Sequence, residues 1–186
     1  MKILLANDDG FDSIGIRALY NIFNREHEVY IVAPDQERSG YSRAISLHKE
    51  ISVEKVEERI YKVGGTPFDC VKLALSGSLE LPKFDLVISG INKGYNLGCD
   101  VWLSGTVGAA HAGMDLTKYA PIALSISNND PKYCLEAATY IHDHLDLFLY
   151  RSDQDGKDLV LNVNIPDVKS KEIKGIKLAS LGKRKP

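Results

Sequence analysis

Short apolar runs alternate along this chain with amphipathic helical segments, and this alternation limits the possible folds more than any other feature. A helical stripe follows the first run, because Ile16, Leu19, Tyr20 and Phe23 recur with the spacing of one helix face. Five runs have the length and composition of strands: residues 2–6, 28–33, 85–91, 122–126 and 159–165. We therefore predict a three-layer α/β fold with a mainly parallel sheet.

Three helix starts are marked by a side chain that can cap a first turn. Thr66 precedes a proline and an acid, Ser104 precedes a run of small residues, and Asp130 precedes a proline. The stretch 45–64 breaks the alternation and predicts short strands or a hairpin around a charged turn. Residues 176–181 predict the beginning of one more strand.

Size and composition favour one domain rather than several. A chain of 186 residues can bury roughly 70% of the surface that its unfolded form exposes, so we expect a single domain over residues 1–186. The 25 acidic and 23 basic residues nearly cancel, which argues against broad attraction to nucleic acid. No apolar stretch approaches the ~20 residues of a membrane span. Cys70, Cys99 and Cys134 form no CxxC pair, and we expect a cytoplasmic protein.

Two adjacent carboxylates, Asp8 and Asp9, follow directly on the first predicted strand. In an open α/β sheet, ligands bind outside the carboxyl ends of the strands, so this pair stands where chemistry tends to occur. Two unit charges about 4 Å apart repel by roughly 4 kcal/mol at an effective dielectric constant of about 20. Such a pair needs a proton, a cation or strong solvation, and a divalent cation is the simplest compensation.

Further oxygen donors are expected at the same edge of the sheet. Ser39 lies in the polar loop after the second strand, and Asn92 ends the strand over 85–91. Asn96 follows in a loop rich in Gly and Asn, and Ser104 begins a helix of small residues. Carboxylate, hydroxyl and amide oxygens favour Mg²⁺ or Mn²⁺ over Zn²⁺. The start of the helix suits phosphate, because its free N–H groups and its dipole both favour negative charge.

Taken together, these residues resemble one known family. In chain order, the segments that carry the likeness are Asn7-Asp8-Asp9-Gly10, Ala33-Pro34-Asp35 with Arg38-Ser39-Gly40, Gly65-Thr66-Pro67 with Asp69-Cys70, Ser89-Gly90-Ile91-Asn92 with Gly94 and Asn96-Leu97-Gly98, and Ser104-Gly105-Thr106-Val107. They closely resemble the SurE (survival protein E) family of 5'/3'-nucleotidases. The likeness runs from Met1 to about Gly182, in order, which makes it far more specific than any one motif.

The resemblance implies a metal-dependent phosphomonoesterase that hydrolyses nucleoside 5'- and 3'-monophosphates, with short polyphosphate as a further substrate of some members. It implies a Rossmann-like fold with a short β-hairpin excursion, and homodimers or homotetramers. One divalent ion per subunit, Mg²⁺ or Mn²⁺, is implied as the cofactor. Members usually continue into an extended arm exchanged between subunits, so we expect this chain to be truncated and its C-terminal arm to be missing.

The same resemblance assigns roles to particular residues. Metal-binding positions of the family are matched by Asp8, Asp9, Ser39 and Asn92. Positions that contact the phosphate are matched by Asn96, Ser104, Gly105 and Thr106.

From these positions we expect Asp8 and Asp9 to be catalytic, with Asp9 also orienting the attacking water. The amides of Gly105 and Thr106 would stabilise charge on the equatorial phosphate oxygens. A covalent route with either aspartate as nucleophile stays open. Two other classes of protein stay open as well. One is a receiver-type signalling domain, which needs a phosphoacceptor Asp where this chain has Asn92, and the other is a nucleotide-binding regulator that hydrolyses nothing.

Overall fold

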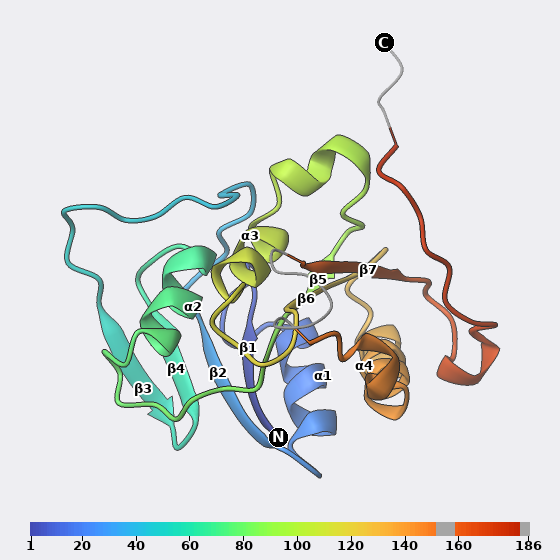
Figure 1. Cartoon of the computed structure of the whole chain (residues 1–186), viewed down its shortest axis with the longest axis horizontal. Helices are drawn as coiled ribbons and strands as arrows, with labels where there is room; N and C mark the ends of the chain where they lie inside the picture. The colour runs from blue at the N-terminus through green and yellow to red at the C-terminus, as the bar shows by residue number, and fades with distance from the viewer. Residues whose placement is uncertain (152–158, 183–186) are drawn as a thin grey trace.

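The computed structural model describes residues 1–151 and 159–182, and within these ranges seven strands form one sheet in the order β3-β4-β2-β1-β5-β6-β7. Six of these strands run parallel to one another, and five of the six lie side by side from β2 to the β7 end of the sheet (Figure 1). These five are β1 (Lys2–Ala6), β2 (Glu28–Pro34), β5 (Leu86–Lys93), β6 (Ile122–Ile126) and β7 (Leu161–Ile165). The predicted strands and the mainly parallel sheet are thus confirmed.

Helices cover both faces of this sheet and complete three layers (Figure 1). One face is covered by α1 (Ile14–Phe23) and α4 (Pro131–Asp143), which lie side by side. The other face is covered by α2 (Pro67–Leu75) and α3 (Gly105–Ala112). Short 3₁₀ turns η1 (Gly98–Trp102), η2 (Leu145–Phe148) and η3 (Ser170–Glu172) lie in the connections.

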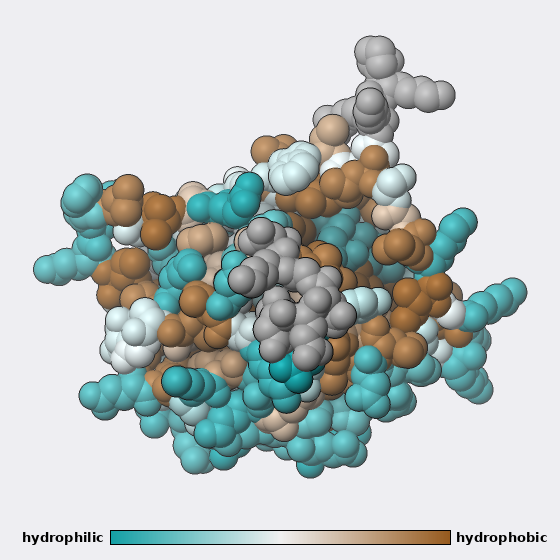
Figure 2. All heavy atoms as spheres, in the orientation of Figure 1, coloured by the Kyte–Doolittle hydropathy of each residue, from teal (hydrophilic) through white to brown (hydrophobic). Residues whose placement is uncertain are grey.

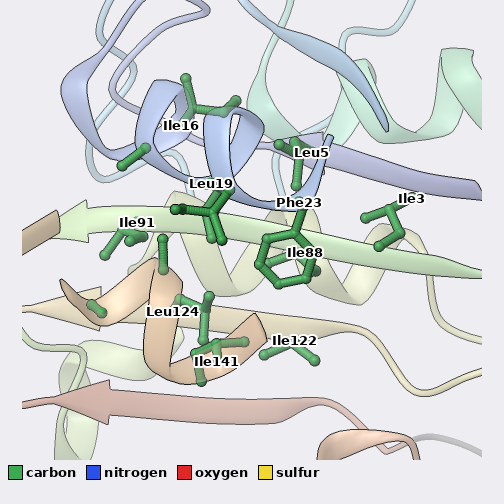
Figure 3. Packing of buried hydrophobic residues seen from close by; sticks show 14 of the residues in the cluster. Ile3, Leu5, Ile16, Leu19, Phe23, Ile88, Ile91, Ile122, Leu124 and Ile141 are labelled. Carbon is green, nitrogen blue, oxygen red and sulfur yellow. The ribbon is translucent and has the colours of Figure 1, made fainter. Parts of the chain in front are cut away.

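The larger core lies between the sheet and the layer of α1 and α4. Leu19 and Phe23 of α1 are fully buried and point toward Ile88 and Ile91 of β5 (Figure 3). Each such side chain contributes about 1.5–3 kcal/mol through its removal from water. The apolar stripe of the first helix is confirmed as the packing face of α1.

The predicted helix starts form as capped turns. Thr66 Oγ1 accepts a hydrogen bond from Asp69 N at 3.1 Å, and Asp69 Oδ2 accepts one from Thr66 N at 3.0 Å. This capping box satisfies two backbone donors that the first turn of α2 leaves without helical partners. Gly77 follows the last turn with a φ of +83°, which suits a residue without a side chain.

The stretch 45–64 contains the expected hairpin, made of β3 (Val53–Glu57) and β4 (Ile60–Val63). Its second strand pairs in parallel with β2, so the hairpin extends the main sheet rather than standing apart from it. The strand expected over 176–181 is wrong, because residues 173–182 of the described chain form no strand. No neighbouring strand pairs with this segment, and Leu178 is 97% exposed.

The surface divides by polarity. Figure 2 shows hydrophobic side chains gathering near the top of the molecule, toward η1 and the C-terminal segment, and hydrophilic ones along the bottom. Large exposed apolar residues in these two segments include Leu97, Trp102, Leu103, Leu178 and Leu181. Within the part of the chain that the structure describes, no helix is long and apolar enough to cross a membrane.

Candidate active site at the carboxyl edge of the sheet

The turn after β1 is tied together by Asn7. Its buried side chain donates from Nδ2 to Gly10 O at 2.8 Å and to Ser13 Oγ at 2.7 Å, while its Oδ1 accepts from Gly10 N at 3.2 Å. Gly10 has a φ of +106°, which a residue with a side chain rarely adopts. These contacts hold Asp8 and Asp9 at the carboxyl edge of the sheet.

Asp8 is docked on the first turn of α3. Asp8 is 3% exposed, and its Oδ1 accepts a hydrogen bond from Thr106 Oγ1 at 2.5 Å. A side chain at Gly105 would place its first carbon 2.8 Å from Asp8 Oδ2, so only glycine allows this approach. Burial raises the pKa of Asp8 above its ordinary value, and the hydrogen bonds from Thr106 partly oppose that rise.

Asp9 stands beside Asp8 in a more open position. Burial, followed by the negative charge of Asp8, raises the pKa of Asp9 to about 6. The Lys93 backbone and ammonium oppose this rise, whereas the nearby carboxylate of Glu37 adds to it. The two aspartates and Glu37 therefore concentrate negative charge that the ammonium of Lys93 offsets only in part.

The loop after β2 comes to the same edge, as predicted. Arg38 N donates to the backbone oxygen of Asp8 at 2.7 Å, which fixes the loop beside the paired acids. Ser39 Oγ donates to Glu37 Oε1 at 2.9 Å and keeps its lone pairs for another partner. At Gly108 of α3 a side chain would collide with the backbone of Ser42. This glycine thus lets the loop lie directly on the helix.

The end of β5 lies next to the end of β1, because Ala6 and Ser89 are partners in the parallel ladder. Asn92 follows on this strand, and its Nδ2 donates to Gly94 O at 2.7 Å, so its Oδ1 is the atom that could coordinate a cation. Gly15 of α1 packs so closely on the backbone of Ile91 that a side chain there would collide with it.

The four residues matched to phosphate contacts have different surroundings. Ser104 Oγ accepts from Val107 N at 3.1 Å and so caps α3, while Gly105 is the first residue of that helix. Thr106 directs its hydroxyl to Asp8. Asn96 is 6% exposed and donates from Nδ2 to Ser125 Oγ at 2.8 Å. The helix start lies beside the acids, whereas Asn96 is fastened to the neighbouring strands.

The donor set fits a hard divalent cation. Asp8, Asp9, Ser39 and Asn92 offer two carboxylates, a hydroxyl and an amide oxygen, which suit Mg²⁺ or Mn²⁺. Across residues 1–151 and 159–182, no group of three or more His, Cys, Asp or Glu side chains is placed to hold a metal ion. Of the four candidate ligands, Ser39 and Asn92 would therefore add neutral oxygens to the carboxylates of Asp8 and Asp9.

Sequence reasoning missed several residues that shape this edge. Glu37 adds charge to the acid pair, and Ser125 holds Asn96. Asn162 and Asn164 of β7 also contact the Asn96 backbone. The sequence did contain an indication of Asn162 and Asn164, because polar residues alternate with apolar ones along the final strand.

The fold and this edge define a class: open, mainly parallel α/β proteins with paired carboxylates placed against the first turn of a helix. Within that class, the family model described as Survival protein SurE matches residues 3–186, and the chain belongs to the SurE family. A protein named 5'-nucleotidase SurE from Stenotrophomonas maltophilia (strain K279a) is 42% identical over 99% of this chain and 71% of its own length. The 5'-nucleotidase SurE of Legionella pneumophila (strain Paris) is 44% identical over the same shares of the two chains.

A solved structure agrees with the sequence comparisons. The crystal structure of the SurE protein from Aquifex aeolicus superposes with a TM-score of 0.86 at 39% identity, over 99% of this chain and 73% of that one. The three-layer fold is therefore that of the family.

Proposed function

We propose that this chain is a nucleotide monophosphate phosphatase that hydrolyses nucleoside 5'-monophosphates to nucleoside and phosphate. The observation that carries the proposal is the placement of Asp8 against Gly105 and Thr106 at the start of α3, with Asp9 beside it. The names of the relatives as 5'-nucleotidase SurE supply the substrate class. Nucleoside 3'-monophosphates and short polyphosphate remain further substrates to test.

We further propose that one divalent ion, Mg²⁺ or Mn²⁺, binds at the acid pair. Asp8, Asp9, Ser39 and Asn92 would hold it, because their oxygens are hard donors and the two carboxylates carry charge that needs neutralising. When bound, the ion supplies Lewis acidity toward the phosphate and lowers the pKa of a coordinated water.

The residues of the chain supply positioning and charge stabilisation. The first N–H groups of α3 lack helical acceptors, so the amide of Gly105 can face an equatorial phosphate oxygen. Asp9 orients the attacking water and accepts its proton, while the bond from phosphorus to the nucleoside oxygen breaks and that oxygen takes a proton from solvent. Asp8 is held by Thr106, which fixes the geometry of the pair.

Direct attack by water is favoured over an aspartyl phosphate formed on Asp8. Asp8 is buried and accepts a hydrogen bond from Thr106, which reduces its reach and its nucleophilicity. A nucleoside phosphorothioate made chiral at phosphorus by an oxygen isotope, hydrolysed in water that carries a third oxygen isotope, separates the two routes. Direct in-line attack inverts the configuration at phosphorus, whereas two successive displacements retain it.

Phosphate release from AMP, GMP, CMP and UMP, each with Mg²⁺, with Mn²⁺ and with chelator, tests the activity. We expect ion-dependent release that is lost in Asp9→Asn. A folded protein that binds nucleotide and releases no phosphate under any of these conditions would instead support a regulator that hydrolyses nothing. A receiver domain has no support, since β5 presents Asn92 in place of a phosphoacceptor and the chain belongs to another family.

Two further properties belong to the same proposal. The thiols of Cys70, Cys99 and Cys134 are all free, which suits the reducing cytoplasm. Assembly into homodimers or homotetramers is supported by exposed apolar side chains such as Trp102 and Leu103 near the site loop.

A further inference from the structure

The two faces of strand β7 differ in chemistry. Leu161, Val163 and Ile165 point to the core shared with α1 and α4. Asn162 and Asn164 alternate with them and lie on the opposite face. Packing explains the apolar residues of this strand, but it does not explain an asparagine pair on the other side.

Both asparagines contact the backbone of one residue in the site loop. Asn164 Oδ1 accepts from Asn96 N at 2.9 Å, and Asn164 Nδ2 donates to Asn96 O at 3.1 Å. Asn162 Nδ2 donates to the same Asn96 oxygen at 2.9 Å. A side-chain amide of β7 thus satisfies both backbone groups of Asn96, as a paired strand would.

The side chain of Asn96 is held by the same layer. Its Nδ2 donates to Ser125 Oγ at 2.8 Å, and Ser125 is fully buried. Ser125 is the ladder partner of Asn92 on β5 and of Asn164 on β7. A polar row therefore crosses three neighbouring strands, from a proposed metal ligand to the asparagine that holds the loop.

Stability alone does not account for Asn162. Its Oδ1 is buried and has no hydrogen-bond partner among the described residues. An unpartnered buried acceptor is destabilising, and an apolar residue of similar size would avoid the loss. Among the described residues, the side chain of Asn162 makes its hydrogen bond to the Asn96 backbone through Nδ2.

We propose that Asn164, assisted by Asn162, is a positioning residue for phosphate binding. This inference rests on the proposed function: by clamping both backbone groups of Asn96, β7 fixes the loop that contacts the phosphate. This clamp, which consists of Asn162 and Asn164, lies on β7. The acid pair follows β1, and β5 and β6 lie between these two strands in the sheet. Loss of the clamp therefore weakens substrate binding more than it slows turnover.

The test uses a graded pair of variants. Asn164→Ala removes both hydrogen bonds to Asn96, and we expect KM for AMP and the Kd of inorganic phosphate to rise about tenfold. kcat should change by less than about threefold. Asn164→Asp keeps an acceptor for Asn96 N but loses the donor to Asn96 O, so its KM should fall between those of the wild type and the alanine variant.

Val163→Ala is the matched control, because it alters the same strand on its other face. It should lower the unfolding temperature and leave KM and phosphate binding unchanged. Equal rises of KM in Val163→Ala and Asn164→Ala would overturn the proposal and reveal a general effect of strand stability. A fall in kcat with unchanged KM in Asn164→Ala would overturn it as well.

Amide hydrogen exchange at Asn96, followed by NMR, gives a readout that needs no catalysis. The Asn96 N–H should exchange faster in Asn164→Ala and stay protected in Val163→Ala and Asn164→Asp. If the wild type hydrolyses no nucleotide, the proposed function fails, while exchange and calorimetric phosphate binding still decide the role of the clamp. Unchanged exchange and unchanged phosphate binding in Asn164→Ala would refute it.

Discussion

The core under α1 and α4 and the carboxyl edge of the sheet are both buried, yet they are built from opposite chemistry. The core is filled by hydrocarbon side chains such as Ile3, Leu19 and Phe23, all fully removed from water. The edge buries Asp8 and Asn96 instead. Burial stabilises the first region directly. The second region keeps like charges close together at a cost in stability, as is typical of functional sites.

The core should respond to substitution through stability alone. Phe23→Ala leaves a cavity in the layer between α1 and β5, and we expect it to lower the free energy of unfolding by about 3–5 kcal/mol. Urea denaturation measures this loss. Leu135→Ala on the exposed side of α4 is the control and should cost less than about 0.5 kcal/mol. If Phe23→Ala lowered kcat per folded molecule, the core would affect catalysis as well as stability, and the two regions would not be separate in function.

Asp9→Asn should reduce activity without reducing stability, whereas Phe23→Ala should reduce stability without reducing activity. Phosphate release should fall well over tenfold, while the metal-free protein becomes more stable by about 1–2 kcal/mol, because a half-buried charge beside Asp8 disappears. Thermal unfolding and initial rates measure the two effects. The exposed Asp146→Asn should change neither. A variant that keeps full activity would remove Asp9 from the mechanism.

The same carboxyl group predicts a pH dependence of stability. Its folded pKa of about 6 exceeds the ordinary value of 3.8, so between these values the folded state holds a proton that the unfolded state has lost. The contribution of Asp9 to the free energy of unfolding must therefore fall as pH rises from about 4 to about 6. Urea titrations across this range should show a shallower fall in Asp9→Asn than in the wild type.

Thr106→Val should produce the smallest effect of these substitutions. It tests a single hydrogen bond at the carboxyl edge of the sheet, the one from Thr106 to Asp8. Loss of the hydroxyl hydrogen bond favours the protonated form of Asp8, so the pKa of Asp8 rises further. The acid limb of the pH–rate profile should then move upward by about 1 unit. Thr106→Ser keeps the hydroxyl and should leave the profile in place. An unshifted profile in the valine variant would mean that this hydrogen bond does not govern Asp8.

The sequence predicted the structure correctly where a pattern among neighbouring residues determines that structure. The stripe of α1, the cap of Thr66 and the polar ends of β1 and β5 are each encoded within a few neighbouring residues. These patterns predicted the layers and brought Asp8 and Asn92 to adjacent strands.

Long-range pairing set the limit of prediction. The hydroxyl of Thr106 reaches Asp8, 98 residues earlier in the chain, and the Asn96 backbone is held from Asn164, 68 residues later. Neither contact can be predicted from a periodic pattern in the sequence, because its two partners lie far apart along the chain. The strand expected over 176–181 failed for a related reason, since apolar residues make a strand only where another strand pairs with them.

Calorimetric titration of the metal-free protein with Mn²⁺ tests most directly whether the carboxylates after β1 form a cation site. We expect one ion to bind per chain at pH 7.5, with much weaker binding in Asp9→Asn and unchanged binding in Asp146→Asn. A properly folded wild-type protein that gives no heat with Mn²⁺ or Mg²⁺ would contradict the assignment.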